Sequence, residues 1–299
     1  MEIINSLFEN NNLSLALGFF DGVHAAHRKI LNTCMELAKK DGLKSAVITF
    51  KKSPGGYFNK EKNINIQTLN DRLELILKTG IDYAYVLDFE DFKNLTAKEY
   101  LNNVLVKYFS PKYIVTGFNH TFGQNRCGNS EFLRANENLG YKYIEIEKMR
   151  LDNTLVSSTN IKKFIQKGYI KEANTLLGYD FNVSGMVIKG MQLAGKLGYK
   201  TANINMPDNI VQPPYGVYFA LVDYDGKKYK SVLNWGIKPT VNGKTPVLEV
   251  HILDFDKDIY GENIKIYFKS PIREEKKFNN LEELKAAITG DVECVLNLK

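Results

Sequence analysis

Two histidines, His24 and His27, follow an apolar segment at residues 13–20 and an Asp21-Gly22 turn. Histidines three residues apart share one face of a helix. The start of a helix has unpaired backbone N–H groups and a partial positive charge, and both attract phosphate. Two imidazoles there could donate hydrogen bonds to phosphate oxygens and stabilise charge in phosphoryl or nucleotidyl transfer. In the alternative, one histidine caps the helix and the other is solvated, but the strand and turn before them favour the phosphate site.

A second segment imitates the GxxxxGK phosphate loop through Gly190, Gly195 and Lys196. That loop needs Ser or Thr as its next residue, to hold Mg²⁺, and Leu197 stands there instead. The surrounding residues also predict a β-barrel and no strand–loop–helix unit. We therefore reject this loop interpretation.

The first half of the chain alternates predicted strands and helices. The strands fall at residues 13–20, 45–50, 83–87, 113–116 and 143–146. The helices fall at residues 24–40, 70–79, 96–108 and 129–139, with Asn70 and Thr96 as N-caps of the second and third. This order predicts a parallel sheet covered by helices on both faces.

The second half has a different pattern. Two short helices at residues 159–167 and 171–177 come first, and one helix at residues 281–288 lies near the end. Between them, predicted strands fall at residues 181–188, 217–223, 228–233, 247–255 and 264–268. Asp225-Gly226 and Asn242-Gly243 have turn chemistry, so we predict an antiparallel barrel. The fold class is therefore α/β plus β, with domains at residues 1–180 and 181–299.

Composition and charge limit the class of protein. The chain has 299 residues, 44% apolar and 25% charged, which suits two folded domains and argues against disorder. The net charge of +6 is spread over both halves, and by itself does not choose between anionic small ligands and nucleic acid. No aromatic–basic repeat is present, so a nucleic-acid-binding module is a weak alternative.

Cysteine spacing and hydropathy predict the compartment. Cys34, Cys127 and Cys294 form no CxxC pair, so we expect reduced thiols and neither a zinc site nor a disulfide framework. No apolar run approaches the ~20 residues that span a bilayer. Glu2 and Glu9 stand where a signal peptide has basic residues. We expect a cytoplasmic protein with no membrane partner.

The residues around the histidine pair resemble the GxFDGVHxGH segment of the bacterial riboflavin kinase/FAD synthetase family, whose N-terminal half is a Rossmann-like nucleotidyltransferase. The matching residues are Gly18, Phe20, Asp21, Gly22, Val23, His24 and His27. Ala26 stands where the family has glycine. Residues 117–128 resemble the family's GxNFxFGxxxxG loop, and residues 156–162 resemble ISSTxIR, with Lys162 in place of arginine. Residues 49–54 depart from the family's TFxPHP, because no histidine is present.

The second half is similar to the riboflavin kinase part of the same family. Residues 190–203 resemble GRxLGFPTAN, with Lys196 replacing arginine and Lys200 replacing proline. Residues 234–240 resemble NIGxRPT, residues 248–261 resemble LEVHLLDF followed by LYG, and residues 271–278 resemble LRxExKF. Alternation along the second of these segments places Glu249 and His251 on one strand face, and we expect His251 to be structural.

The resemblance implies roles for individual residues. His24 and His27 are catalytic, and the nucleotide-binding residues of the first half are Gly18, Phe20, Asp21, Gly22, Asn119, Arg126, Ser158, Thr159 and Lys162. Ser158 is also the expected N-cap of its helix. In the second half, the loop of Gly190, Gly195 and Lys196 covers the nucleotide phosphates, Glu249 is the general base, Thr201 and Asn203 help to hold Mg²⁺, and Asn234 and Arg273 lie in the flavin site.

The resemblance thus implies a bifunctional enzyme. The C-terminal domain would make FMN from riboflavin and ATP, and the N-terminal domain would transfer AMP from a second ATP to FMN, giving FAD and pyrophosphate. Both steps need Mg²⁺ and positioning of the reactants. Two alternatives remain: the same architecture with one activity lost, which Ala26, Lys162, Lys200 and residues 51–53 motivate, and a non-catalytic flavin or nucleotide sensor.

Overall fold

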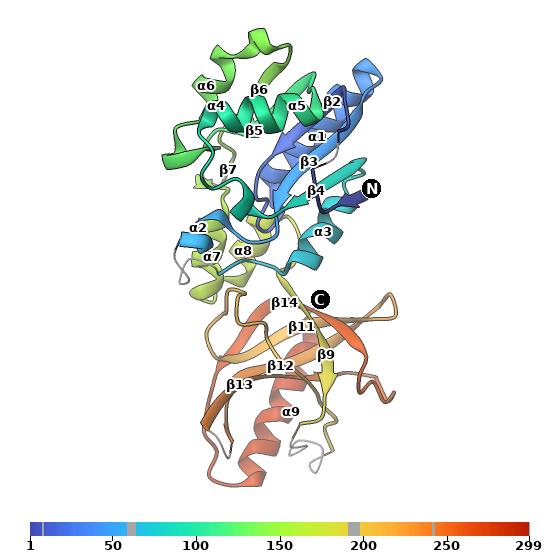
Figure 1. Cartoon of the computed structure of the whole chain (residues 1–299). Helices are drawn as coiled ribbons and strands as arrows, with labels where there is room; N and C mark the ends of the chain where they lie inside the picture. The colour runs from blue at the N-terminus through green and yellow to red at the C-terminus, as the bar shows by residue number, and fades with distance from the viewer. Residues whose placement is uncertain (8, 59–63, 191–197, 241–242, 299) are drawn as a thin grey trace. The chain divides into compact units, whose positions relative to one another are not determined.

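The protein divides into two compact units, Met1–Ser158 and Thr159–Lys299 (Figure 1). The structure is a computed structural model that describes residues 1–7, 9–58, 64–190, 198–240 and 243–298. Two helices, α7 (Ser158–Gln166) and α8 (Ile170–Leu177), fall almost entirely in the second unit. The predicted domain boundary near residue 180 stays a prediction.

The first unit is built on a six-stranded sheet in which every neighbouring pair is parallel. Its order is β1-β4-β3-β2-β5-β6, and the strands are β1 (Glu2–Ile4), β2 (Leu13–Leu17), β3 (Lys44–Phe50), β4 (Tyr83–Leu87), β5 (Tyr113–Gly117) and β6 (Lys142–Ile146). The predicted parallel sheet is confirmed, and the short edge strand β1 is additional to it. The first predicted strand ends early, at Leu17, because the chain then turns through Phe20 at a φ of 58°.

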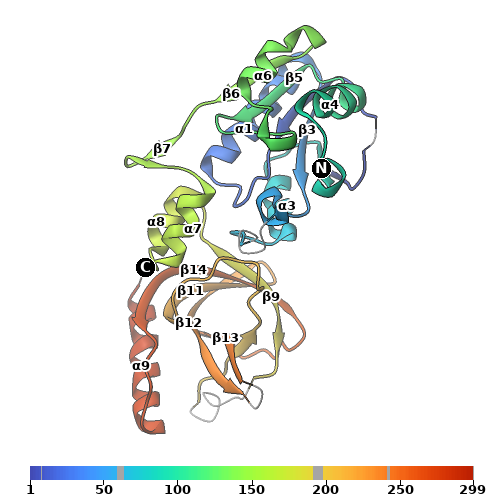
Figure 2. The ribbon, with the colours of Figure 1, turned by 60° about the vertical axis from the view of Figure 1, so that its left-hand side comes forward.

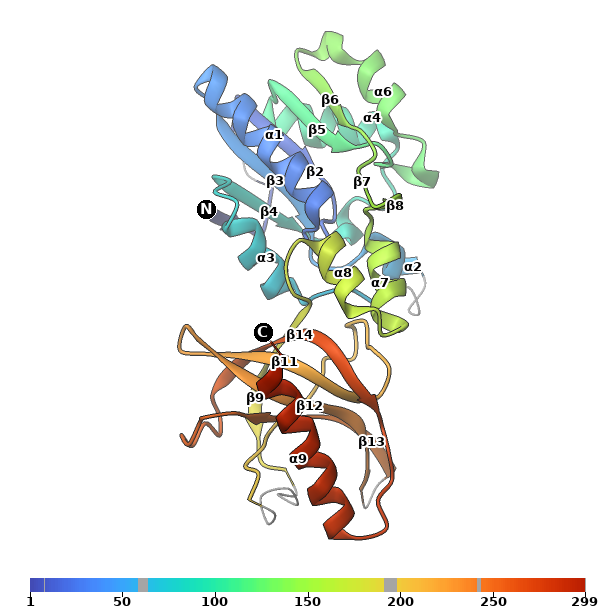
Figure 3. The same cartoon turned by 180° about the vertical axis from the view of Figure 1, so that it is seen from behind.

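Helices cover both faces of this sheet, as predicted. α1 (Ala25–Asp41) and α3 (Leu69–Leu77) lie over one face (Figure 3). The other face carries α4 (Ala97–Tyr100), a π-helical stretch (Leu101–Val106), α5 (Lys107–Phe109) and α6 (Ser130–Ala135). Side chains of β2 alternate between the two faces of the sheet. Leu15 packs on the face that carries α4, α5 and α6, and Ala16 packs on the face that carries α1 and α3. The remaining short elements are α2 (Pro54–Phe58), β7 (Arg150–Leu151) and β8 (Thr154–Leu155).

Two predicted helix starts have different outcomes. Thr96 caps α4 as predicted, in a capping box with Glu99. The N-cap of α3 is Thr68, whose hydroxyl accepts from the Asp71 N–H at 3.2 Å. The prediction of Asn70 as the cap is wrong, because extended backbone at Thr68 starts the helix at Leu69 and leaves Asn70 in its first turn.

The second unit is a closed barrel with only antiparallel pairs, in the order β10-β13-β12-β11-β14-β9. Its strands are β9 (Asn182–Ile188), β10 (Ala202–Ile204), β11 (Gly216–Tyr224), β12 (Lys227–Thr240), β13 (Gly243–Ile252) and β14 (Asn263–Glu274). The predicted barrel is confirmed, and β10 is additional to the prediction. Asp225-Gly226 joins β11 to β12 with φ values of 53° and 73°, as a type I′ turn requires. Asn242, in the other predicted turn, lies outside the described residues.

The last helix, α9 (Leu281–Asn297), lies along the outside of the barrel (Figure 2, Figure 3). It extends beyond the predicted helix at 281–288, because Val295 near its end packs against the apolar outer face of the barrel. Lys230 of β12 donates to the carbonyl oxygens of Val295, Leu296 and Leu298. A cation at a helix C-terminus complements the helix dipole, so Lys230 fixes this end of α9.

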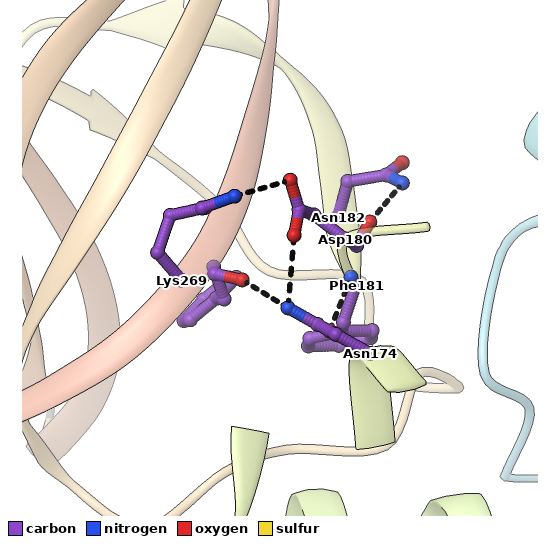
Figure 4. Close-up of polar contacts among 6 residues, drawn as sticks. Asn174, Asp180, Phe181, Asn182 and Lys269 are labelled. Carbon is purple, nitrogen blue, oxygen red and sulfur yellow. Dashed lines mark hydrogen bonds and ion pairs between the residues drawn. The ribbon is translucent and has the colours of Figure 1, made fainter. Parts of the chain in front are cut away.

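A polar network joins α8 to the barrel (Figure 4). The Asn174 amide donates to the Phe268 carbonyl at 2.9 Å and to Asp180 Oδ1 at 3.1 Å, and it accepts from the Phe181 N–H at 2.8 Å. Lys269 of β14 pairs with the other oxygen of Asp180 at 2.9 Å. One side chain thus satisfies a backbone N–H just before β9 and a backbone carbonyl on β14.

Replacing Asn174 by alanine should lower the free energy of unfolding of the second unit by about 2–3 kcal/mol, since two backbone groups lose their partner. The only tryptophan, Trp235, is buried in the barrel, so its fluorescence during urea unfolding measures this unit. Thr175→Ala, at the exposed neighbouring position, is the control and should change stability by less than about 0.5 kcal/mol. Equal unfolding midpoints for the two variants would contradict the role of Asn174.

Candidate functional site

The turn after β2 is held in a fixed shape by its neighbours. Gly18 starts it, and a Cβ at Gly18 would lie 3.0 Å from the Phe20 ring. Asp21 is buried, and its Oδ1 accepts from the Ile66 N–H at 2.8 Å. Gly22 has a φ of 85°, a conformation that favours glycine. The predicted residues Gly18, Phe20, Asp21 and Gly22 therefore shape the backbone that leads into α1.

The histidine pair lies at the start of α1. His24 is its N-cap, and His24 Nδ1 accepts from the His27 N–H at 3.3 Å. The two rings stack with centroids 3.6 Å apart and an interplanar angle of 13°. The edge of the Phe20 ring packs against His27 at 5.2 Å. The spacing of the two histidines thus brings them onto one side of the helix start, as predicted.

Both imidazoles are neutral at neutral pH. Burial, reinforced by the charge of Arg28, lowers the pKa of His24 to about 3. Burial also lowers the pKa of His27 well below its usual value, with further lowering by His24, Arg72 and Arg28. Because Nδ1 of His24 accepts a hydrogen bond, the proton of its neutral ring is assigned to Nε2. His24 can therefore donate an Nε2–H to a ligand oxygen at the helix start.

The loop after β5 lies beside this turn. β2 and β5 are adjacent parallel strands, and the strand order reverses its direction between them. Open α/β sheets bind their ligands at such a topological switch point, beyond the carboxyl ends of the strands. Gly123 has a φ of 72°, and a Cβ there would lie 2.6 Å from the Ala97 nitrogen. Phe122 and Gly128 pair across the loop through two backbone hydrogen bonds. The predicted residues Asn119 and Arg126 are exposed on this loop.

The third predicted segment contacts the turn through Ser158. Ser158 is the first residue of α7, so the prediction that it precedes the helix as N-cap is wrong. Its hydroxyl donates instead to the Asp21 carbonyl at 2.8 Å. Thr159 is exposed and Lys162 is half-buried farther along α7.

The candidate site of the second unit lies where β10, β13 and β12 are neighbours. Strand register places Glu249 opposite Asn203 on one side and opposite Asn234 on the other. Residues directly opposite in a sheet have their side chains on the same face. Thr201 Oγ1 donates to Glu249 Oε1 at 2.7 Å. The barrel therefore brings four of the predicted residues together from three strands and the segment before β10.

The donor set of this site fits a hard divalent cation. Asn203 is 2% exposed, and its Oδ1 has no hydrogen-bond partner among the described residues. Gly190 packs on the same amide, where a Cβ would lie 2.2 Å from Asn203 Nδ2. Amide and hydroxyl oxygens suit Mg²⁺, so Asn203 and Thr201 are the residues that would hold it. The predicted residues Gly195 and Lys196 lie outside the described residues.

Strand register links Arg273 to Glu249 through Asn234 and Val217, so the Arg273 and Glu249 side chains share one face of the barrel wall, three strands apart. Arg273 forms a bidentate ion pair with Asp291 of α9, with Nε–Oδ1 and Nη2–Oδ2 distances of 2.9 and 2.8 Å. Asp291 is 5% exposed and is absent from the predicted site residues, since no sequence spacing links it to Arg273. The ion pair fixes the guanidinium on the side of the barrel that α9 covers.

Two further residues in this region have structural contacts. Lys200, which stands in place of the family's proline, pairs with Asp256 on the surface. His251 Nδ1 lies 2.7 Å from the Lys200 carbonyl oxygen, and the His251 ring packs edge-on against Tyr199. These contacts orient the segment that carries Thr201, which agrees with the structural role expected for His251.

Comparison with known proteins gives matches in both halves. A family described as FAD synthetase matches residues 7–160, and one described as riboflavin kinase matches residues 177–298. The bifunctional riboflavin kinase/FMN adenylyltransferase of Buchnera aphidicola subsp. Schizaphis graminum is 34% identical, over 96% of this chain and 94% of its own. The enzyme of the same name from Bacillus subtilis is 32% identical, over 93% and 89%. A crystal structure titled macrolide-efflux protein, from Streptococcus pneumoniae, has 31% identity and a TM-score of 0.88, covering 99% of this chain and 96% of that one.

A parallel α/β unit and an antiparallel barrel, each with a site suited to phosphate chemistry, define a two-part nucleotide-dependent transferase. The chain belongs to the family of bifunctional riboflavin kinases/FMN adenylyltransferases. The predicted family and fold class are confirmed. Within the described part of the chain, no helix has the length and apolar character needed to cross a membrane. The cytoplasmic location stays a prediction.

Proposed function

We propose that the barrel phosphorylates riboflavin at Glu249 and that the α/β unit adenylylates the resulting FMN at the histidine pair. The chain is a bifunctional transferase that uses ATP for both steps. The observation that carries the residue assignment is the position of Glu249, between two amides and within 2.7 Å of a hydroxyl, on one face of three adjoining strands. Riboflavin, FMN, FAD and ATP are its small-molecule partners.

In the kinase step, a Glu249 carboxylate oxygen accepts the proton of the terminal ribityl hydroxyl of riboflavin. The hydroxyl oxygen forms a bond to the γ-phosphorus of ATP, and the bond to the β–γ bridging oxygen breaks, so ADP leaves. Thr201 orients the carboxylate by donating to Oε1. A general base acts only within hydrogen-bond reach of the proton, so this fixed orientation is the contribution of the barrel. When bound at Asn203 and Thr201, Mg²⁺ would neutralise the phosphate charge.

In the adenylyl transfer, an FMN phosphate oxygen forms a bond to the α-phosphorus of ATP, and the bond from that phosphorus to the α–β bridging oxygen breaks, so pyrophosphate leaves. The attacking phosphate is already ionised, so this step needs no general base. It needs donors for the charge on the phosphate oxygens. The Nε2–H of His24 and the N-terminus of the 17-residue helix α1 supply such donors. His27 supports the pair by packing against the His24 ring.

The direct test of the two activities is to incubate the full chain with riboflavin, ATP and Mg²⁺ and to separate the flavins by chromatography. Accumulation of FAD is expected. FMN as the sole product would support the alternative with only the kinase activity. With FMN supplied in place of riboflavin, FAD formation tests the adenylyltransferase by itself. No product from either flavin would support a non-catalytic sensor.

Replacing Asn203 by alanine should raise the Mg²⁺ concentration for half-maximal FMN formation by about 10-fold or more, because the site loses a buried oxygen. The measurement is a Mg²⁺ titration of the kinase at saturating ATP and riboflavin. Asn205→Ala, at an exposed position just beyond β10, is the matched control and should not change the titration. An unchanged titration for Asn203→Ala would remove this residue from the metal site.

A further inference from the structure

Arg72 of α3 is a buried arginine directly behind the turn that leads to the histidine pair. It is 3% exposed, although burial of an unpaired cation is strongly unfavourable. Burial lowers the pKa of Arg72 to about 10, and the charge of Asp21 opposes this shift, so the guanidinium stays charged at neutral pH. Because burying this charge is unfavourable, the contacts of Arg72 must offset the free energy of burial.

The contacts of Arg72 fasten two central strands at their carboxyl ends. Its Nη2 donates to the carbonyl of Phe50, the last residue of β3. Its Cζ lies 4.1 Å from the centre of the Phe19 ring, in the turn after β2. A planar guanidinium can stack on a ring and donate in its own plane at the same time, which a lysine ammonium cannot do. Arg72 therefore fixes the turn relative to β3.

Arg72 also acts on the histidine pair electrostatically. The charged or titratable groups that influence His27 are His24 and Arg28 at the start of α1 and Arg72 from α3. Asp21 in the turn interacts with Arg72. Burial and the His24 ring lower the pKa of His27 most, and the charges of Arg72 and Arg28 lower it further.

We propose that Arg72 is a positioning residue for the adenylyl transfer: by joining Phe19 to Phe50 it sets the turn from which His24 and His27 meet the nucleotide phosphates. This role rests on the proposed function of the histidine pair. Arg72 acts through the turn and the two rings and does not contact the substrates. The Nε of Arg72 has no hydrogen-bond partner among the described residues, so the Phe19 stacking, the Nη2 bond and the attraction of Asp21 hold the side chain.

The test compares Arg72→Met, Arg72→Lys and the control Arg134→Met, which removes an arginine paired with Glu145 on the surface of the same unit. The chain has four histidines, so their proton resonances can be assigned with His→Gln variants and titrated by NMR without substrate. In Arg72→Met the titration of His27 should move to higher pH, because a neighbouring positive charge is lost. The resonance of His251, in the second unit, should not move.

Activity gives the second readout. For FAD formation from supplied FMN, kcat should fall about 10- to 100-fold in Arg72→Met, the cost of a small displacement of catalytic groups. KM for ATP should stay within about threefold, since a group that only positions others contributes no direct substrate contact. The kinase activity of the same chain should be unchanged. Arg72→Lys keeps the charge and loses the planar contacts, so His27 should titrate as in the wild type while kcat still falls.

The proposal is overturned if kcat for FAD formation is the same in folded Arg72→Met and in the wild type, whereas an unchanged His27 titration would remove only the electrostatic action of Arg72. The proposal is also overturned if KM for ATP rises with kcat unchanged, which would make Arg72 a direct binding residue. Should Arg72→Met fail to fold, wild-type kcat in Arg72→Lys would overturn it. The two proposals fail separately. Full activity in His24 variants would end the proposed role of the histidine pair, whereas wild-type kcat in Arg72→Met would end the role of Arg72.

Discussion

Replacing Glu249 by glutamine should lower FMN formation from riboflavin by about 10²–10⁴-fold, the usual contribution of a general base. Glutamine has nearly the same shape and can still accept the hydrogen bond from Thr201. It cannot accept the ribityl proton, so the attacking oxygen keeps its proton as the bond to phosphorus forms. The measurement is the initial rate of FMN formation at saturating riboflavin, ATP and Mg²⁺.

The other activity of the chain is the internal control for this variant. FAD formation from supplied FMN should be unchanged in Glu249→Gln, because that step uses the first unit. Glu262→Gln, at an exposed position before β14, is the matched control for loss of one carboxylate from the barrel. Similar losses in both activities of Glu249→Gln would mean that the role of Glu249 is misassigned.

Strand alternation predicted which face of β13 carries Glu249, but not its neighbours. Leu248 and Val250 are completely buried and Glu249 lies on the opposite face, as a period of two requires. Its closeness to Asn203 depends on the register between β10 and β13, which are separated by about forty residues of chain. Hydrophobic pattern alone could not give this register, because β10 has only three residues and was not predicted.

The same limit applies to the charged residues behind the sites. By itself, the segment at residues 271–278 is typical of a solvated charged stretch, yet Arg273 is held in a bidentate ion pair by Asp291. Arg72 has no sequence signal that separates it from an exposed helical arginine. Its burial arises only when α3 packs behind the turn after β2. Sequence motifs thus located the residues that we propose to contact ligands. The residues that orient those side chains, such as Arg72 and Asp291, could not be found in this way, because their positions depend on packing between distant segments.

Replacing His24 by alanine should lower FAD formation from supplied FMN by about 10²–10³-fold, the cost of removing one preorganised donor to a developing charge. FMN formation from riboflavin should be unchanged. His24 has two roles in the structure, however, since its Nδ1 also caps α1. Loss of the cap would lower the free energy of unfolding by about 0.5–2 kcal/mol, so alanine alone cannot separate catalysis from helix stability.

His24→Asn separates the two roles. Asparagine is among the best N-cap residues, so the thermal stability of the first unit should return toward that of the wild type. Its amide is shorter than an imidazole and does not reach the position of Nε2, so FAD formation should stay low. Wild-type activity in His24→Asn together with low activity in His24→Ala would mean that His24 acts only as a cap. Full activity in both variants would remove it from the reaction, and the charge on the phosphates would then be stabilised by the α1 N–H groups and other cations.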